Sequence, residues 1–197
     1  MSREHPLARK WNQRYAASTD AGTPAAVLLN CAHLLPVLPA RGNALDLACG
    51  LGANARFLAE RGLHSEGWDI SQIALDQLAL WRGCNGERVH TRLQDVEAEP
   101  PAPASFDVIV VSDFLHRPLC SALSAALRPG GLLFYQTWCA DKRSAAGPSN
   151  PDFLLQTSEL HRLFAGLEIR FYQHLAQAGD LTRGDRDRAC LVAQQPR

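Results

Sequence analysis

The sequence predicts an α/β protein, a single doubly wound domain with a mostly parallel seven-stranded sheet and a C-terminal antiparallel hairpin. Three observations predict this fold. Helical and strand-like segments alternate along the 197 residues, as in strand–helix units. The unbroken β-branched run from Val108 to Val111 suits a central strand that is buried on both faces. Two strand-like segments close the chain, at 167–175 and 189–194.

The other elements are expected in a regular order. An apolar helix at 25–35 begins after Thr23-Pro24, a cap followed by a first-turn proline, and is stopped by Pro36, Pro39 and Gly42. We expect five strands before the closing pair, at 44–48, 64–70, 88–93, 106–111 and 132–138. Four further helices are expected at 54–61, 71–81, 119–127 and 158–164. Pro129-Gly130-Gly131 is expected to turn the chain into the fifth strand.

Length and charge limit the class of protein. A chain of this length fits one domain better than two. Lys plus Arg and Asp plus Glu both number 20, so the formal net charge is zero, and no nucleic-acid partner is expected. The N-terminus lacks the apolar core of a signal peptide, and the apolar stretches are too short to span a membrane. We therefore expect a cytoplasmic protein without a membrane partner.

The cysteines are expected to be structural. The chain has six, at Cys31, Cys49, Cys84, Cys120, Cys139 and Cys190. They form no Cys-x-x-Cys pair, and no two histidines have metal-ligand spacing. Buried, reduced thiols and the absence of a metal site are therefore predicted.

The turn after the first expected strand has the composition of a ligand site. Residues 45–52 read Leu-Asp-Leu-Ala-Cys-Gly-Leu-Gly, and a helix is expected to follow. Gly50 and Gly52 let a ligand approach the backbone closely, because no Cβ stands in the way. The start of the helix offers free amide hydrogens and the positive end of a dipole. This arrangement favours a carboxylate or a phosphate.

Polar groups also end the next strands. Asp69 comes 23 residues after Asp46, the spacing of an acid that binds ribose hydroxyls; a helix cap ahead of Ser71 is the alternative. Asp95 follows the third strand and is suited to bind an adenine amino group, with an ordinary loop aspartate as the alternative. Ser112 ends the fourth strand. Ligands of open α/β sheets bind at the carboxyl ends of strands, so these groups are expected to surround one ligand.

Together these motifs resemble those of the class I S-adenosylmethionine-dependent methyltransferases, which have a Rossmann-like sheet. Residues 46–52 resemble the first motif, Trp-Asp-Ile-Ser at 68–71 the acidic second motif, and Gln-Asp-Val at 94–96 the adenine-side motif. Residues 106–111 and 127–131 resemble the fourth strand and the turn before the fifth. The resemblance implies S-adenosylmethionine as the cofactor, bound by Arg14, Asp46, Gly50, Gly52, Asn54, Asp69, Ile70, Asp95, Val96 and Ser112.

Within this class the chain looks most like small bacterial methyltransferases of the tellurite-resistance and thiopurine type. Residues 11–15, Trp-Asn-Gln-Arg-Tyr, resemble the segment that folds over the cofactor there. This resemblance would bring Arg14 to the methionine carboxylate; a surface helix with an aromatic anchor is the alternative. It implies one methyltransferase domain with cap helices at 1–40, a cofactor-binding core at 41–138, a loop or lid at 139–157, and a C-terminal helix with closing strands at 158–197.

Methyl transfer requires little chemistry from side chains. The cofactor carries the activated methyl group, and the protein aligns the reactants and excludes water. A general base is needed only if the nucleophile arrives protonated. His116 is the candidate base, with a packing or capping histidine as the alternative. Candidates for the pocket of a small-molecule acceptor are Tyr15, Phe114 and Trp138, with core packing as the alternative. Asp113 is the candidate for binding a cationic substrate, with a helix cap as the alternative.

Two other functions fit part of the pattern. A nicotinamide-dependent oxidoreductase would tolerate Ala55 in place of a third glycine, but the chain lacks a Tyr-x-x-x-Lys pair, and Asp95 has no role in that chemistry. A non-catalytic cofactor-binding or regulatory module would keep the same glycines and acids. The segment 140–151, and the segment before Thr23, are expected to form a cover that excludes water.

Overall fold

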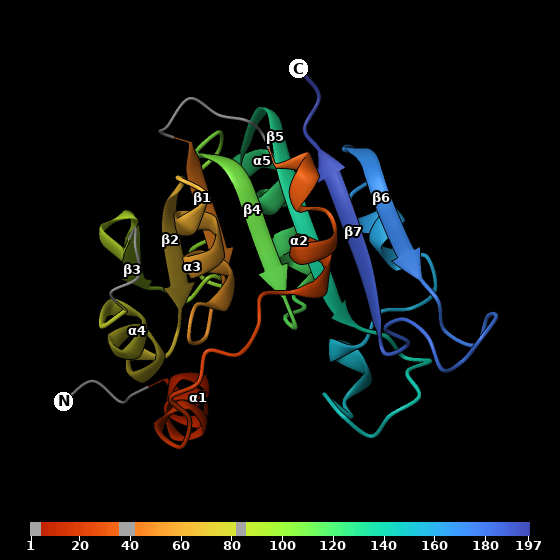
Figure 1. Ribbon diagram of the computed structural model, residues 1–197, viewed down its shortest axis with the longest axis horizontal. Coiled ribbons are helices and arrows are strands. Elements are labelled where there is room, and N and C mark those ends of the chain that lie inside the picture. The colour runs from red at the N-terminus through yellow and green to blue at the C-terminus, as the bar shows by residue number, and fades with distance from the viewer. Residues whose placement is uncertain (1–4, 36–41, 82–85) are drawn as a thin grey trace.

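Seven strands form one sheet in the order β3-β2-β1-β4-β5-β7-β6 (Figure 1). The computed structural model describes residues 5–35, 42–81 and 86–197. The strands are β1 (Asn43–Leu47), β2 (His64–Asp69), β3 (Val89–Leu93), β4 (Phe106–Ser112), β5 (Leu127–Trp138), β6 (Glu168–His174) and β7 (Arg188–Gln194). The pairings among β1 to β5 are all parallel, whereas β7 is antiparallel to both β5 and β6. The predicted fold class is confirmed.

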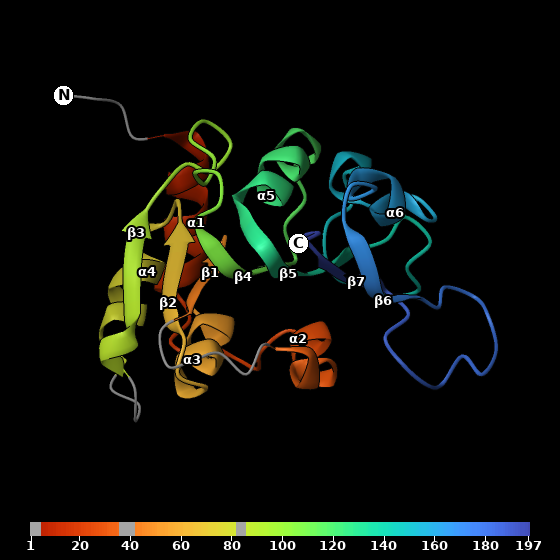
Figure 2. The same ribbon diagram turned by 90° about the horizontal axis from the view of Figure 1, so that it is seen from above.

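Helices cover both faces of this sheet. They are α1 (Pro6–Ala16), α2 (Ala26–Asn30), α3 (Ala53–Glu60), α4 (Gln72–Ala79), α5 (Cys120–Ala126) and α6 (Glu159–Leu163), with the short 3₁₀ turns η1 (Ala32–Leu34), η2 (Gly86–Arg88), η3 (Arg117–Leu119) and η4 (Pro151–Phe153). Figure 2 shows α5 and α6 on one face and α2 and α3 on the opposite face. No helix in the described part of the chain is long and apolar enough to cross a membrane.

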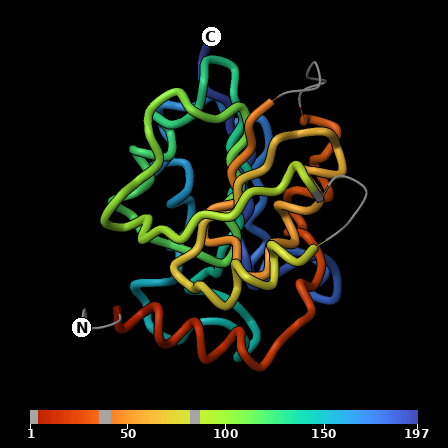
Figure 3. Tube along the Cα trace, turned by 90° about the vertical axis from the view of Figure 1, so that its left-hand side faces the viewer, coloured from red at the N-terminus to blue at the C-terminus, as the bar shows by residue number. Residues whose placement is uncertain are grey.

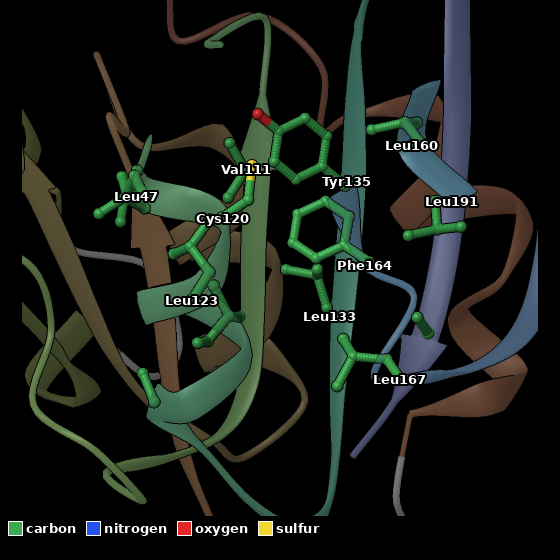
Figure 4. Close-up of a cluster of buried hydrophobic side chains, with 14 of the residues drawn as sticks. Leu47, Val111, Cys120, Leu123, Leu133, Tyr135, Leu160, Phe164, Leu167 and Leu191 are labelled. Carbon is green, nitrogen blue, oxygen red and sulfur yellow. The ribbon is translucent and has the colours of Figure 1, made fainter. Parts of the chain in front are cut away.

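The alternation of β4 side chains divides the core into two layers. Ile109 and Val111 pack with α5 and α6, and Val108 and Val110 pack with α2 and α3. All four side chains are fully buried, because a parallel strand in the middle of a doubly wound sheet is covered on both faces. Figure 4 shows the first layer, in which Tyr135 and its neighbours pack against β4 and α5. The sequence prediction of a central strand here is confirmed.

Two expected elements differ in the structure. The helix predicted at 25–35 is divided into α2 and η1 at Cys31, whose φ of −111° and ψ of 19° are not helical; two of its predicted stop residues, Pro36 and Pro39, lie outside the described residues. The turn predicted at 129–131 lies inside β5. There Phe106 pairs with Leu127 and Val108 with Leu132, so the proline and glycines form a bulge in a continuing strand.

Arg117 joins the end of β4 to the segment before α6. Its guanidinium donates to both carboxylate oxygens of Glu159, at 2.7 and 3.0 Å, and to the carbonyls of Asp152 and Leu154. The Arg117 hydrogen bonds hold the pKa of Glu159 below its usual value. One planar cation thereby fixes two points of the loop that follows β5 and the start of α6, because its donors match two carbonyls and a carboxylate at once.

We expect Arg117→Ala to lower the free energy of unfolding by about 2–3 kcal/mol, because it leaves the nearly buried Glu159 carboxylate without its charged partner. Urea denaturation measures this change. Arg128→Ala is the matched control, since it removes a more exposed ion pair with Asp107 and should cost about 1 kcal/mol or less. Equal losses in the two variants would contradict a special role for Arg117.

Candidate cofactor site

The turn between β1 and α3 has a backbone that requires glycine. Gly50 and Gly52 have φ values of +52° and +77°, and even Ala48 has a φ of +54°. A Cβ at Gly52 would come within 2.4 Å of the Leu78 side chain, and one at Gly50 within 2.6 Å of the Tyr15 hydroxyl. Left-handed backbone and close neighbours together exclude larger residues at both glycines.

A buried hydrogen-bond network lies directly beneath this turn. The Asp46 carboxylate accepts from the side-chain amide of Asn54 at 3.1 Å and from the backbone N–H of Ala55 at 3.0 Å. The Asn54 amide also donates to the Ser112 hydroxyl on β4, and its oxygen accepts from the N–H of Ala25. Asp46 and Asn54, both predicted to bind the cofactor, are buried. These hydrogen bonds stabilise the turn from the side of the core. Asp46 and Asn54 would therefore not contact a ligand themselves but would position the turn backbone that does.

Asp69 ends β2 beside the turn. One carboxylate oxygen accepts from the N–H of Gly50 and the other from the N–H of Ser71, both at 2.8 Å. Burial raises the pKa of this carboxyl, and the backbone hydrogen bonds oppose that shift. The residue that caps α4 is Ser71, whose hydroxyl accepts from Ala74. A carboxylate has about four acceptor positions, and the backbone of Ile70 also hydrogen-bonds to this one, so Asp69 keeps about one position for a ligand hydroxyl. Ile70, which follows it, is half-buried.

The residues predicted on the adenine side have local roles. The Asp95 carboxylate accepts from the N–H groups of Glu97 and Ala98, and its side chain is 35% exposed. Val96 is buried in the core layer under α5. The carboxylate thus stabilises the turn after β3, as expected for an ordinary loop aspartate. It is also accessible to solvent at the carboxyl edge of the sheet.

Helix α1 lies across this edge, below the end of β2 in Figure 1 and along the lower border of the molecule in Figure 3. The side-chain oxygen of Asn12 accepts from the Ser71 hydroxyl at 2.7 Å, and the Gln77 amide donates to the carbonyl of Tyr15. The Tyr15 ring reaches Gly50. Burial, and then the charge of the nearby Asp69, raise the pKa of this phenol above its usual value.

These contacts change the interpretation of residues 11–15. Tyr15, predicted to line the acceptor pocket, lies instead on the glycine turn, because the direction of α1 brings its last turn there. Arg14, predicted to approach the methionine carboxylate, is exposed, and its guanidinium carbon lies 5.4 Å from the centre of the Trp11 ring. Trp11 in turn stacks on Tyr15 at 5.7 Å.

The end of β4 carries a strained, paired aspartate. Asp113 has a φ of +54°, and its carboxylate receives two hydrogen bonds from Arg188, at 2.6 and 3.0 Å. It is therefore not a free anion for a cationic substrate, as its prediction supposed. The Arg188 guanidinium lies 3.7 Å from the centre of the Trp138 ring, and Gly147 of the 140–151 segment packs on the same ring. Phe114 is half-buried against the core.

His116, the candidate base, faces a carboxylate that the sequence analysis did not identify. Its Nδ1 lies 3.5 Å from a Glu97 carboxylate oxygen, and its side chain is 28% exposed. Glu97 lies in the segment that crosses from β3 to β4, and His116 follows β4, so only the tertiary fold brings them together. Asn12 and Arg188 were missed for the same reason, since their partners lie 59 and 75 residues away in the chain.

Residues 44–131 match the family model described as a methyltransferase domain. A ubiquinone biosynthesis O-methyltransferase of Idiomarina loihiensis is 32% identical over 99 residues, which are 47% of this chain and 41% of that protein. The corresponding protein of an Azoarcus species is 33% identical over 99 residues, 47% of this chain and 42% of its own length. The chain thus spans about two-fifths of the length of these relatives.

Solved structures share the fold over nearly the whole chain. A [4+2]-cyclase superimposes with a TM-score of 0.71 at 18% identity, covering 96% of this chain and 95% of its own. The geranyl diphosphate C-methyltransferase of Streptomyces coelicolor A3(2), solved with S-adenosyl-L-homocysteine, has a TM-score of 0.69 at 15% identity, with coverages of 97% and 99%. A S-adenosylmethionine-dependent methyltransferase of Methanosarcina mazei gives 0.64 at 17% identity, with coverages of 89% and 99%.

The comparisons thus give a matched segment and a shared fold. Residues 44–131 match the model of a methyltransferase domain, and the chain shares its fold with S-adenosylmethionine-dependent methyltransferases of known structure. The closer resemblance to the tellurite-resistance and thiopurine type stays a prediction.

The buried Asp46 carboxyl generates a prediction about pH. Burial raises its pKa from the usual 3.8 to about 7. Between these values the folded protein holds a proton that the unfolded chain releases, so the free energy of unfolding falls as the pH rises from about 4 to 7. Asp46→Asn cannot ionise and should flatten this slope in urea denaturation across the same range. Asp69 contributes a residual slope of the same sign. An unchanged slope in the variant would contradict the assignment.

Proposed function

We propose that this protein transfers the methyl group of S-adenosylmethionine to a small-molecule acceptor by direct displacement. The observation that carries the proposal is the Asp69 carboxylate held against the N–H of Gly50, at 2.8 Å. This contact places an acid with a remaining acceptor position beside the Gly50 and Gly52 turn.

The residues present fit this cofactor. Gly50 and Gly52 carry no Cβ, so a ligand could approach the backbone of the turn once Tyr15 is displaced from Gly50. Asp69, followed by Ile70, would receive the ribose hydroxyls, and Asp95 with Val96 would form the adenine side. Arg14 would reach the methionine carboxylate once α1 shifts, since it is exposed on that helix.

Entry of the cofactor requires a rearrangement of α1. Tyr15 covers the face of Gly50 that a ligand of the turn needs. The helix is held against α4 by the side-chain contacts of Asn12 and Gln77, and such contacts open at small cost relative to the core. We propose that α1 moves aside for binding and then covers the site. The 140–151 segment is the second proposed cover.

The cofactor, when bound, supplies a methyl carbon that is already activated. The chain then has to orient the acceptor and exclude water. Phe114 and Trp138 lie at the ends of β4 and β5 and would border the acceptor. His116, oriented by Glu97, would take a proton only from an acceptor that arrives protonated.

The names of the relatives suggest which chemical class of methyl acceptor to propose. The curated relatives are O-methyltransferases, so hydroxylated small molecules are the first acceptors to test. Thiols and metalloid anions come second, on the resemblance to the thiopurine and tellurite-resistance type. A shared fold does not decide the chemistry, because one structural neighbour is a [4+2]-cyclase. A cofactor-binding module without methyl transfer is therefore the second candidate function.

We expect S-adenosylhomocysteine to bind and to raise the melting temperature, whereas NAD and NADP do not. Calorimetry and thermal shift measure this directly. Asp69→Ala should weaken binding by about 1.5–3 kcal/mol, the scale of charge-assisted hydrogen bonds. Incubation with methyl-labelled cofactor and hydroxylated acceptors then separates a transferase from a binding module. Tight NAD binding without S-adenosylhomocysteine binding would overturn the proposal.

We expect Tyr15→Ala to tighten S-adenosylhomocysteine binding about three- to tenfold, because it removes the side chain that a ligand must displace before reaching Gly50. Stopped-flow fluorescence should show the gain as faster association. Tyr15→Phe is the matched control, since it keeps the ring and removes only the hydroxyl. Weaker binding in Tyr15→Ala would show instead that the tyrosine packs on the bound cofactor.

A further inference from the structure

Three chemically different metal-binding side chains meet beside the carboxyl end of β5. Cys139 follows β5 directly, Asp141 lies in the next turn, and His174 ends β6. Their ligand atoms, one sulfur, one oxygen and one nitrogen, all lie within 4.8 Å of one another. In the described parts of the chain this is the one group of three such side chains that close together.

The sheet builds this group from segments that are distant in sequence. Thr137 on β5 and His174 on β6 both pair with Ala189 on the intervening strand β7. Residues directly opposite in antiparallel strands share a face, and Cys139 lies two residues beyond Thr137 on that face. The cysteine and the histidine therefore approach each other across β7. Asp141 closes the gap, with a carboxylate oxygen 2.9 Å from His174 Nε2.

The surroundings are those of a built site. Cys139 is fully buried, and the His174 side chain is 5% exposed. Asp141 is 36% exposed and lies on the solvent side. A second carboxylate, Asp185, is close enough to act electrostatically on the Cys139 sulfur. Asp185 is itself paired with Arg188 at 3.2 Å, so the carboxylate available to a cation beside the buried sulfur and nitrogen is that of Asp141.

We propose that Cys139, Asp141 and His174 bind one divalent metal ion of the zinc type. Zinc takes cysteine, histidine and aspartate ligands at about 2.0–2.3 Å. In a tetrahedral arrangement, these bond lengths put the ligand atoms roughly 3.3–3.6 Å apart. The observed separations, from 2.9 Å to within 4.8 Å, bracket that range, so small side-chain rotations suffice. Three protein ligands leave a fourth position for water or another ligand.

This site was not expected from the sequence. The absence of a Cys-x-x-Cys pair and of paired histidines predicted no metal, but His174 comes 33 residues after Asp141. None of the three residues belongs to the proposed cofactor site, and Asp141 is the only one in the 140–151 segment that is proposed to cover it.

Cobalt substitution tests the proposal with the full chain. After removal of metal with a chelator, the protein should bind one equivalent of Co²⁺ and develop the near-ultraviolet absorption of a thiolate–cobalt bond. One equivalent of Zn²⁺ should displace it and raise the melting temperature. If the wild-type protein is folded but gives no thiolate–cobalt absorption, the proposal is overturned.

Variants assign the ligands. His174→Gln and Asp141→Asn should each weaken metal binding more than about tenfold, since the loss of even an outer partner of a metal ligand costs 10–100-fold. Cys139→Ser should abolish the cobalt absorption, and Cys190→Ser, which changes another buried thiol, should retain it. Should Cys139→Ser fail to fold, the Asp141 and His174 variants decide. Full affinity in both would show that Asp141 and His174 form only a hydrogen bond.

Discussion

The arrangement of the site depends on one buried carboxyl, Asp46. Its two oxygens hold Asn54 and the first turn of α3, and Asn54 extends the network to β4 and to the entry of α2. A buried polar group without partners is costly, so the network has to be complete for the turn to form. Its completeness explains how a left-handed glycine turn is held still above a sheet that is otherwise packed with aliphatic side chains.

A second constraint is that parallel strands end at a common edge. The glycine turn, Asp69, Asp95 and Ser112 follow successive strands, and the order β3-β2-β1-β4 sets them side by side. Helix α1 uses the same edge, where Asn12 and Tyr15 satisfy polar groups of α4 and cover Gly50. The described conformation is thus one in which the chain itself occupies the face of the turn that we propose binds the cofactor.

The two halves of the sheet differ in the partners of their carboxyl groups. Near β1 and β2, carboxyls are buried and bound to backbone N–H groups, which preserves a turn for a ligand. Near β5 to β7, the carboxyls of Asp113 and Asp141 meet Arg188 and His174, which ties the C-terminal hairpin to the parallel part. The segment that matches the methyltransferase domain model, residues 44–131, thus adjoins a C-terminal part with its own polar chemistry.

The sequence by itself determined the fold class, the succession of helices and strands along the chain with most of their bounds, and the glycine turn with Asp69. Apolar periodicity and glycine spacing are local signals, so they can be recognised without the tertiary structure. Tertiary structure decided the partners. No local pattern shows that Asp46 and Asn54 are buried beneath the turn. Nor does one show that Tyr15 packs on Gly50, or that Cys139 approaches His174 across β7. Each of these contacts joins residues from different elements, and only the strand order and the direction of α1 bring their side chains together.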